Sequence, residues 1–327
     1  MPRIENPSSV EPPHHPSRRT FLCLGISSLL VPSVHGQVDQ WISQGRQLME
    51  NQIDLDAVQA LAKGDLRQTE TILRSLEDLL DADDLAPIGE LQDWVENALP
   101  LLEAHPDTAP YASWLRARAD YFEVAHNLTP QPAPTPPTKE KPSKRIAPAP
   151  VHPTPNQARV AWNKEVKAKA QPKGASAWLP RLKSQFRRSG VPTELAWLAE
   201  IESGFEPAAR SPHGAAGMYQ LMPATAQTMG LKTSPTDERL VPEKNAQAAA
   251  TYLGQLHRQF KNWHLALAAY NAGPGRVSST LKQRRATTFD AIAPSLPAET
   301  QLYVPRFEAV LQEREGKALA KLPAPTA

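Results

Sequence analysis

Apolar side chains recur at spacings of three and four residues along most of this chain, a pattern typical of amphipathic helices. In the segment 37–128 the pattern covers residues 40–49 and 55–80, and it returns near Trp94 and from Trp114 onward. Acidic side chains occupy the remaining faces of these helices. The pattern predicts a small helical region with an acidic, solvated surface, and it indicates no chemical site there.

The same periodicity resumes after Gln157 and extends to about residue 318. Its first apolar stripe joins Trp178, Leu182 and Phe186, and Gly190 interrupts it. Aromatic residues make up only 6% of the chain and β-branched runs are scarce, which argues against an all-β fold. We therefore predict a mainly α protein.

A stretch rich in proline separates the two helical regions. Ten of the 34 prolines fall between Thr129 and Asn156. Proline removes backbone donors and favours an extended polyproline conformation, so we interpret 129–156 as a semi-rigid Pro-rich linker. Because few contacts cross such a linker, we expect the region 157–318 to fold alone, and we expect 319–327 to be a disordered tail.

The first 36 residues have the organisation of an export signal. Arg18 and Arg19 precede an apolar run, 21–31, which is too short to cross a bilayer but has the length of a signal-peptide core. Small and medium residues predict cleavage after Gly36. The arginine pair resembles a twin-arginine signal with Cys23 where Lys is usual, and a Sec signal or an unstructured tail are the alternatives. We expect an exported protein of the periplasm or cell envelope without a stable transmembrane anchor.

Charge and cysteine content exclude several classes of protein. The formal net charge is +2, which argues against a nucleic-acid partner. The charges are nevertheless separated, because 37–128 holds 18 acidic and 6 basic residues whereas 129–190 holds 2 acidic and 13 basic. The single cysteine excludes an intrachain disulfide and a cysteine-based zinc site. His213 and His257 lack partners at metal-ligand spacing, and no phosphate loop or dinucleotide fingerprint occurs, so we expect no metal and no cofactor.

The strongest candidate for chemistry is Glu202. A helix that opens at Glu194 ends there, since Ser203-Gly204 follow and Pro207 prevents continuation. A carboxylate in this place faces the negative end of the helix dipole, and a neighbour such as Phe205 would remove it from water. Both effects raise the pKa of the carboxyl group, as a general acid for glycosidic cleavage requires.

Four motifs occur in order along the second helical region. They are Glu202-Ser203-x-Phe205, Gly217-Met218-Tyr219-Gln220-Leu221-Met222-Pro223, Ala269-Tyr270-Asn271-Ala272-Gly273 and Pro297-x-Glu299-Thr300-x-x-Tyr303-Val304. Together they resemble the catalytic domain of lytic transglycosylases with a goose-lysozyme-like fold, over roughly residues 178–315. The likeness is greatest to the soluble and D-type murein transglycosylases, and it implies a lysozyme-like α+β catalytic domain.

The resemblance implies an activity and a partner. The substrate would be peptidoglycan glycan strands, cleaved between N-acetylmuramic acid (MurNAc) and N-acetylglucosamine (GlcNAc). Glu202 would be the single catalytic acid and then the base, and the muramoyl 6-hydroxyl would attack to leave 1,6-anhydroMurNAc ends. Tyr270 corresponds to the tyrosine that lies near the acid and orients it. The motifs supply the other candidate substrate-binding residues, which are Ser203, Phe205, Met218, Tyr219, Gln220, Asn271, Glu299 and Tyr303.

Alternatives stay open at this point. A hydrolytic lysozyme or chitinase of the same fold would use water in place of the 6-hydroxyl, and a non-catalytic wall-binding scaffold would keep the fold alone. Taken singly, Tyr270 and Met218 fit a core as well as a cleft, and Glu299 could cap the helix after it. The loop reads Gly-Met-Tyr-Gln where the family often has Gly-Leu-Met-Gln or Gly-Leu-Trp-Gln, which leaves the sugar subsites open. The region 37–128 is a candidate surface for other envelope proteins.

Overall fold

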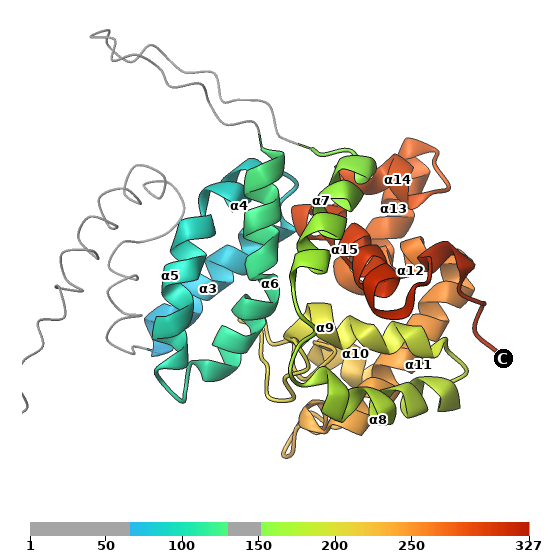
Figure 1. Ribbon diagram of the computed structural model, residues 1–327. Helices are drawn as coiled ribbons and strands as arrows, with labels where there is room; N and C mark the ends of the chain where they lie inside the picture. Colours follow the sequence, from blue (N-terminus) through green and yellow to red (C-terminus); the bar gives the residue numbers. More distant parts are fainter. Residues whose placement is uncertain (1–65, 130–151, 327) are drawn as a thin grey trace, which may run out of the picture. The chain divides into compact units, whose positions relative to one another are not determined.

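The computed structural model describes residues 66–129 and 152–326. The predicted export signal, most of the Pro-rich linker and the helical pattern before residue 66 lie outside these ranges. Within them the chain is helical, and β structure is limited to two isolated bridges, Arg210 with Ala216 and Ala216 with Leu221. The predicted mainly α class is confirmed (Figure 1). None of the helices in these two ranges is both long and apolar enough to cross a membrane.

The first described range forms four helices, as its apolar periodicity predicted. They are α3 (Leu66–Asp81), α4 (Ala86–Glu90), α5 (Gln92–Glu103) and α6 (Ala109–Leu128). The apolar stripe of α3 is buried, and α6 buries Trp114 and Tyr121. A side chain at Gly89 would lie within 2.7 Å of the α6 backbone at His126, so glycine allows α4 to approach α6 closely.

The second range holds the remaining helices. They are α7 (Pro155–Ala168), α8 (Ala175–Arg188), η1 (Thr193–Trp197), α9 (Leu198–Ser203), α10 (Pro223–Thr228), η2 (Glu238–Leu240), α11 (Pro242–Phe260), α12 (Trp263–Ala272), α13 (Pro274–Arg284), α14 (Phe289–Ile292), η3 (Ala293–Ser295), α15 (Ala298–Glu315) and η4 (Leu319–Lys321). Helix α15 is central, because α3, α7, α9 and α12 all pack against it and every residue from Thr300 to Phe307 is buried. A helix in this position can carry side chains into the interior from several faces.

The two ranges do not stand apart as the linker predicted. Both belong to one compact unit, in which α6 packs against α7 and α9. Arg306 of α15 donates a hydrogen bond of 2.6 Å to the carbonyl of Ala117, and its guanidinium lies 4.9 Å from the ring centre of Tyr121. The expectation that 157–318 is separate from the acidic helices therefore differs from the structure. The density of prolines predicts only the conformation of the connecting chain. Whether the two helical regions pack together depends on the apolar faces that each region can bury.

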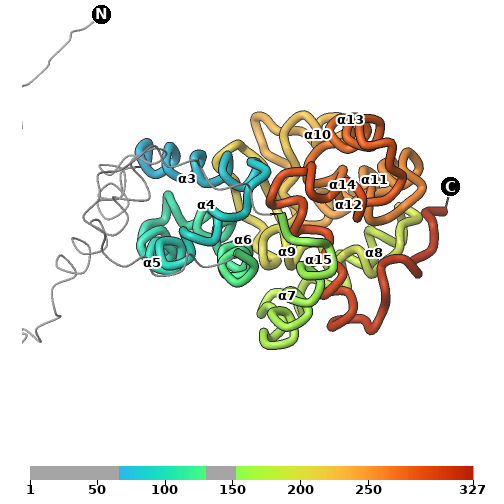
Figure 2. Tube along the Cα trace, turned by 90° about the horizontal axis from the view of Figure 1, so that it is seen from above, coloured from blue at the N-terminus to red at the C-terminus, as the bar shows by residue number. Residues whose placement is uncertain are grey.

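The prediction of a disordered tail at 319–327 is wrong for residues 319–326. Leu319, in the turn η4, is buried, and the indole of Trp263 donates a hydrogen bond of 3.0 Å to the carbonyl of Pro323. The amide of Thr326 donates to the carbonyl of Gly190 at 2.8 Å, which places the end of the chain beside α8 (Figure 2). Two buried leucines, Leu319 and Leu322, and the hydrogen bonds to the carbonyls of Pro323 and Gly190 fix a segment whose composition is typical of disorder.

Candidate active site

Glu202 lies in the last turn of α9, as the sequence predicted. The helix ends at Ser203, and Gly204 follows in the left-handed conformation (φ +63°), which stops the helix without a steric penalty. Phe205 is also left-handed (φ +66°), a strained conformation for an aromatic residue. Its ring packs edge-on against Trp197 at 5.9 Å. This turn fixes the direction of the Glu202 side chain, which is only 4% exposed.

Two other helices supply partners to the Glu202 carboxyl group. The hydroxyl of Tyr303, on α15, donates a hydrogen bond of 2.6 Å to Oε1. The guanidinium of Arg118, on α6, lies 3.7 Å from Oε2 and donates to the backbone carbonyl of Glu202 at 3.3 Å. The acid is therefore held from both sides by groups that lie far from it in the sequence.

The pKa of Glu202 is raised to about 7. Burial is the largest cause, since it removes the charged form from water. The positive charge of Arg118 and the hydrogen bond from Tyr303 lower the pKa, whereas the negative charge of Glu299 raises it. The direction agrees with the sequence-based expectation. A carboxyl group of this pKa can be protonated or ionised near neutral pH, so it can both give and take a proton.

Two further carboxylates, both half-buried, act on Arg118. Glu299, at the start of α15, lies 3.2 Å from Nε of Arg118. Glu77, on α3, accepts a hydrogen bond of 2.8 Å from the backbone amide of His213, and burial raises its pKa. Arg118 is thus a cation on which the negative charges of Glu202, Glu299 and Glu77 all act.

The loop after α9 is shaped by close backbone contacts. A side chain at Gly217 (φ +82°) would lie 2.0 Å from the carbonyl oxygen of Arg239, so only glycine fits. Arg239 in turn donates to the carbonyls of Gly214 and Leu221 at 2.7 and 2.9 Å. The side-chain amide of Gln220 donates to the Gly217 carbonyl at 2.9 Å. These bonds hold the loop rigidly next to the end of α9.

Several residues predicted to bind substrate lie in the interior instead. Met218 and Tyr219 are completely buried, and the Tyr219 hydroxyl donates to the carbonyl of Ala196 at 2.9 Å. Ser203 is buried and donates to the carbonyl of Met218 at 2.9 Å, and the ring of Phe205 is 2% exposed. Apart from Glu202, these residues of the first two motifs therefore contribute mainly the shape of the backbone, because their side chains are engaged in internal packing and hydrogen bonds.

The residues that remain partly exposed come from the later motifs. Tyr270, Asn271 and Glu299 are half-buried. The hydroxyl of Tyr270 donates to the Tyr219 carbonyl at 2.7 Å, and Asn271 accepts a hydrogen bond of 2.5 Å from Thr300. Tyr303, which is 1% exposed, donates the hydrogen bond to the Glu202 carboxylate, whereas the resemblance implied that Tyr270 lies near the acid and orients it.

Sequence reasoning missed Arg118 and Glu77, which belong to the region where it found no chemistry. A signal for Arg118 was present. It lies four residues from both Trp114 and Phe122, which places a cation on the apolar face of an otherwise acidic segment. Its guanidinium lies 5.0 Å from the ring centre of Trp114 and is buried. Nothing in the sequence indicated which carboxylates it would meet.

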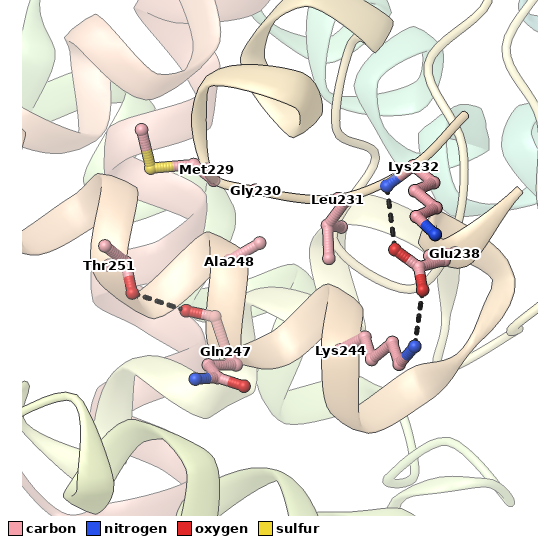
Figure 3. A pocket seen from close by; sticks show the side chains of 9 residues that line it. All are labelled: Met229, Gly230, Leu231, Lys232, Glu238, Lys244, Gln247, Ala248 and Thr251. Carbon is pink, nitrogen blue, oxygen red and sulfur yellow. Dashed lines mark hydrogen bonds and ion pairs between the residues drawn. The ribbon is translucent and has the colours of Figure 1, made fainter. Parts of the chain in front are cut away.

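A separate pocket of about 390 Å³ lies between the end of α10 and helix α11 (Figure 3). Its wall contains Glu238, which accepts hydrogen bonds from the backbone of Lys232 at 2.7 Å and from the side chain of Lys244 at 2.5 Å. The predicted site residues do not line it. Elsewhere in the two described ranges, no three His, Cys, Asp or Glu side chains are grouped as metal ligands would be.

Comparison with known proteins connects this site to one family. The family model of the transglycosylase SLT domain matches residues 182–292. The membrane-bound lytic murein transglycosylase D of Escherichia coli is 35% identical over 140 residues, which is 42% of this chain and 31% of that protein. The soluble lytic murein transglycosylase of Salmonella typhimurium is 41% identical over 116 residues, or 33% of this chain and 18% of that protein.

A solved structure is also similar. It is that of an inactive mutant of the lytic transglycosylase Slt from Pseudomonas aeruginosa, with 21% identity and a TM-score of 0.41 over 88% of this chain and 51% of that one. The chain spans less than a third of the length of the two relatives named above. Glu202, the loop at Gly217 and Tyr270 all lie within residues 182–292, the part of the chain that matches the family model of the transglycosylase SLT domain.

Proposed function

We propose that this protein is a peptidoglycan lytic transglycosylase. It cleaves the β-1,4 bond between MurNAc and GlcNAc and leaves 1,6-anhydroMurNAc ends. The observation that carries the proposal is a buried carboxyl group, Glu202, which lies within the SLT domain and has a pKa raised to about 7. The two relatives named above are lytic murein transglycosylases, which supports the same substrate.

The proposed reaction uses one carboxyl group twice. Protonated Glu202 gives its proton to the glycosidic oxygen as the bond to the anomeric carbon of MurNAc breaks. The carboxylate then takes the proton of the muramoyl 6-hydroxyl while that oxygen bonds to the anomeric carbon. Tyr303 and Arg118 stabilise the carboxylate between the two steps, because one donates a hydrogen bond to it and the other is positively charged.

The other site residues divide into two groups in this proposal. Tyr270, Asn271 and Glu299 are half-buried, and in this proposal they face the substrate. The buried group shapes the loop and holds the acid, and it consists of Ser203, Phe205, Met218, Tyr219, Gln220 and Tyr303. Substitutions in the first group are therefore expected to alter KM, and substitutions in the second to alter kcat or stability.

The proposed place of action is the periplasm or cell envelope. Residues 1–36 would direct export, and the product would begin near Gln37. Replacing Arg18 and Arg19 with lysine tests the twin-arginine route, since a Sec signal tolerates that change. The acidic helices 37–128 remain a candidate surface for other envelope proteins.

Digestion of purified peptidoglycan by the full chain, followed by mass spectrometry of the products, tests the activity. Anhydro ends are expected. Reducing ends would instead indicate a hydrolytic lysozyme, and an absence of cleavage would indicate a wall-binding scaffold. Glu202→Gln keeps the size of the side chain but removes the transferable proton, so activity should fall by about 10²–10⁴-fold. Glu313→Gln, an exposed position on α15, is the matched control and should retain activity.

A further inference from the structure

We propose that Arg118 is a positioning residue of the active site, so that helix α6 of the acidic region belongs to the catalytic unit. In this proposal Arg118 holds Glu202 and Glu299 at fixed places and balances their charges. The proposal rests on the proposed role of Glu202 as the acid. It adds a residue outside the SLT match, from a segment in which the sequence indicated no chemistry.

The geometry fixes the guanidinium on three sides. Nη1 donates to the backbone carbonyl of Glu202 at 3.3 Å, and Nη2 lies 3.7 Å from the Glu202 carboxylate. Nε lies 3.2 Å from a carboxylate oxygen of Glu299. The indole of Trp114 covers one face at 5.0 Å. One side chain thus contacts both the backbone and the carboxylate of the acid, and it connects them to the first turn of α15.

Burial makes a purely structural role a poor explanation. Arg118 is 6% exposed and Glu202 4% exposed. Removing charged groups from water is so costly that buried ion pairs are often no more stabilising than apolar residues of similar volume. Compared with apolar residues of similar volume, the buried pair of Arg118 and Glu202 is therefore expected to add little net stability, although removing one partner alone leaves the other charge unpaired. Arg118 has a clear effect on chemistry, because its charge alters how readily Glu202 binds its proton.

Charged and titratable groups act on Glu202 from three helices. They are Arg118 on α6, Tyr270 on α12, and Glu299, Tyr303 and Arg306 on α15, while Glu77 on α3 acts on Arg118. Two of these groups are cations, and Arg306 is engaged with Asp120 at 3.2 Å and with the Ala117 carbonyl. Arg118 is thus the cation in direct contact with the acid, and Glu299 is the anion that opposes it.

The two neighbours act in opposite directions. The charge of Arg118 lowers the pKa of Glu202, whereas the charge of Glu299 raises it. Replacing Arg118 with a neutral residue should raise the pKa, and replacing Glu299 should lower it. Since the free enzyme needs protonated Glu202, the alkaline limb of kcat/KM should move to higher pH in the first case and to lower pH in the second. A residue with a merely structural role would reduce activity without moving this limb.

The test uses the full chain in four variants, namely Arg118→Met, Arg118→Lys, Glu299→Gln and the double variant Arg118→Met with Glu299→Gln. Carbon-13 NMR of labelled glutamate carboxyls gives the pKa of Glu202 directly, with Glu202→Gln identifying its signal. We expect Arg118→Met to raise the pKa by about 1 unit or more and Glu299→Gln to lower it. Arg118→Lys keeps the charge and should stay nearest to wild type, and the double variant should lie between the single ones.

Shifts in opposite directions, with the alkaline limb following them, support the proposal. An unchanged pKa in folded Arg118→Met, or the same direction in both single variants, would overturn it. If Arg118→Met fails to fold, Glu299→Gln decides, because with Arg118 unopposed the pKa must fall. The NMR titration needs no substrate, so it separates this proposal from the activity. An active Glu202→Gln would refute the proposed function, whatever the titration shows.

Discussion

The SLT segment, residues 182–292, and the helices on either side of it contribute different things to the surroundings of Glu202. The segment supplies the acid, the tight loop at Gly217 and the half-buried Tyr270. The flanking helices supply Arg118 from one side and Tyr303 with Glu299 from the other. The part of the chain that matches the family model therefore carries the proposed acid, whereas the charged and hydrogen-bonding groups that modify its pKa come from outside that part.

The contacts that join the acidic helices to the rest also fall into two kinds. Arg118 and Arg306 are buried and meet Glu202 and the α6 backbone. Asp81, at the end of α3, pairs with Arg276 on the surface, where the two side chains are 60% and 44% exposed. Removing one partner of a buried ion pair lowers the free energy of unfolding strongly, whereas removing one partner of an exposed pair changes it little. The stability of the interface between the acidic helices and the rest of the molecule should therefore depend mainly on the buried contacts of Arg118 and Arg306.

Removing the acidic helices is the harshest test of this comparison. A fragment of residues 157–327 keeps every motif residue but lacks Arg118 and the backbone that Arg306 contacts. We expect its activity to fall by at least about 100-fold, because a small misplacement of a catalytic group has an effect of that size. The fragment should also melt at a lower temperature than a chain beginning at Gln37, which is the control. Full activity in the fragment would restore the boundary that the Pro-rich linker indicated.

A single methyl group added to the loop within the SLT segment should also have a large effect, in this case on stability. In Gly217→Ala the new methyl group would lie 2.0 Å from the Arg239 carbonyl, and the residue must also keep a φ of +82°. We expect a loss of about 2–4 kcal/mol in the free energy of unfolding, measured by urea titration. Both the clash and the strained backbone contribute to this value.

Gly214→Ala separates these two contributions. Gly214 has a φ of +91°, but a side chain there would meet no atom within 4 Å. This variant should lose only the cost of the backbone conformation, about 1–2 kcal/mol. Equal losses in the free energy of unfolding in both variants would mean that the close contact with the Arg239 carbonyl does not contribute to the loss.

These residues also indicate how far the sequence could lead. The end of α9 at Glu202 followed from local signals, namely the apolar stripe before it and the Ser-Gly-Pro pattern after it. The burial of Met218 and Tyr219 did not follow, because a flexible or aromatic side chain suits a core and a cleft equally well. The partners of Glu202 depend on tertiary packing, since Arg118 and Tyr303 lie 84 and 101 residues away along the chain. No local pattern specifies such a pairing.

Tyr303 offers a milder test of the groups outside the SLT segment. Tyr303→Phe removes the hydrogen bond of 2.6 Å to the Glu202 carboxylate and leaves the ring in place. Because that bond lowers the pKa of Glu202, its loss should raise the pKa and move the alkaline limb of kcat/KM to higher pH. The carboxylate formed during the reaction also loses a donor, so kcat should fall about tenfold.

Tyr111→Phe is the matched control for this variant. The Tyr111 hydroxyl donates a bond of the same length, 2.6 Å, to a different carboxylate, Glu70. It should leave the pH profile unchanged. A profile that moves in Tyr111→Phe and not in Tyr303→Phe would remove Tyr303 from the site.

The smallest effect is expected at the exposed end of the interface. Asp81→Asn removes the ion pair with Arg276, whose two contacts measure 2.9 and 3.1 Å, and replaces the carboxylate with a group of the same shape. Water competes for both side chains, so the free energy of unfolding should change by about 0–1 kcal/mol, and the difference should shrink as salt is added. Activity should remain that of the wild type, because Asp81 makes no contact with the buried cluster around Arg118. A loss of more than about 2 kcal/mol that persists in high salt would mean that the surface pair, and not the interior, holds the acidic helices in place.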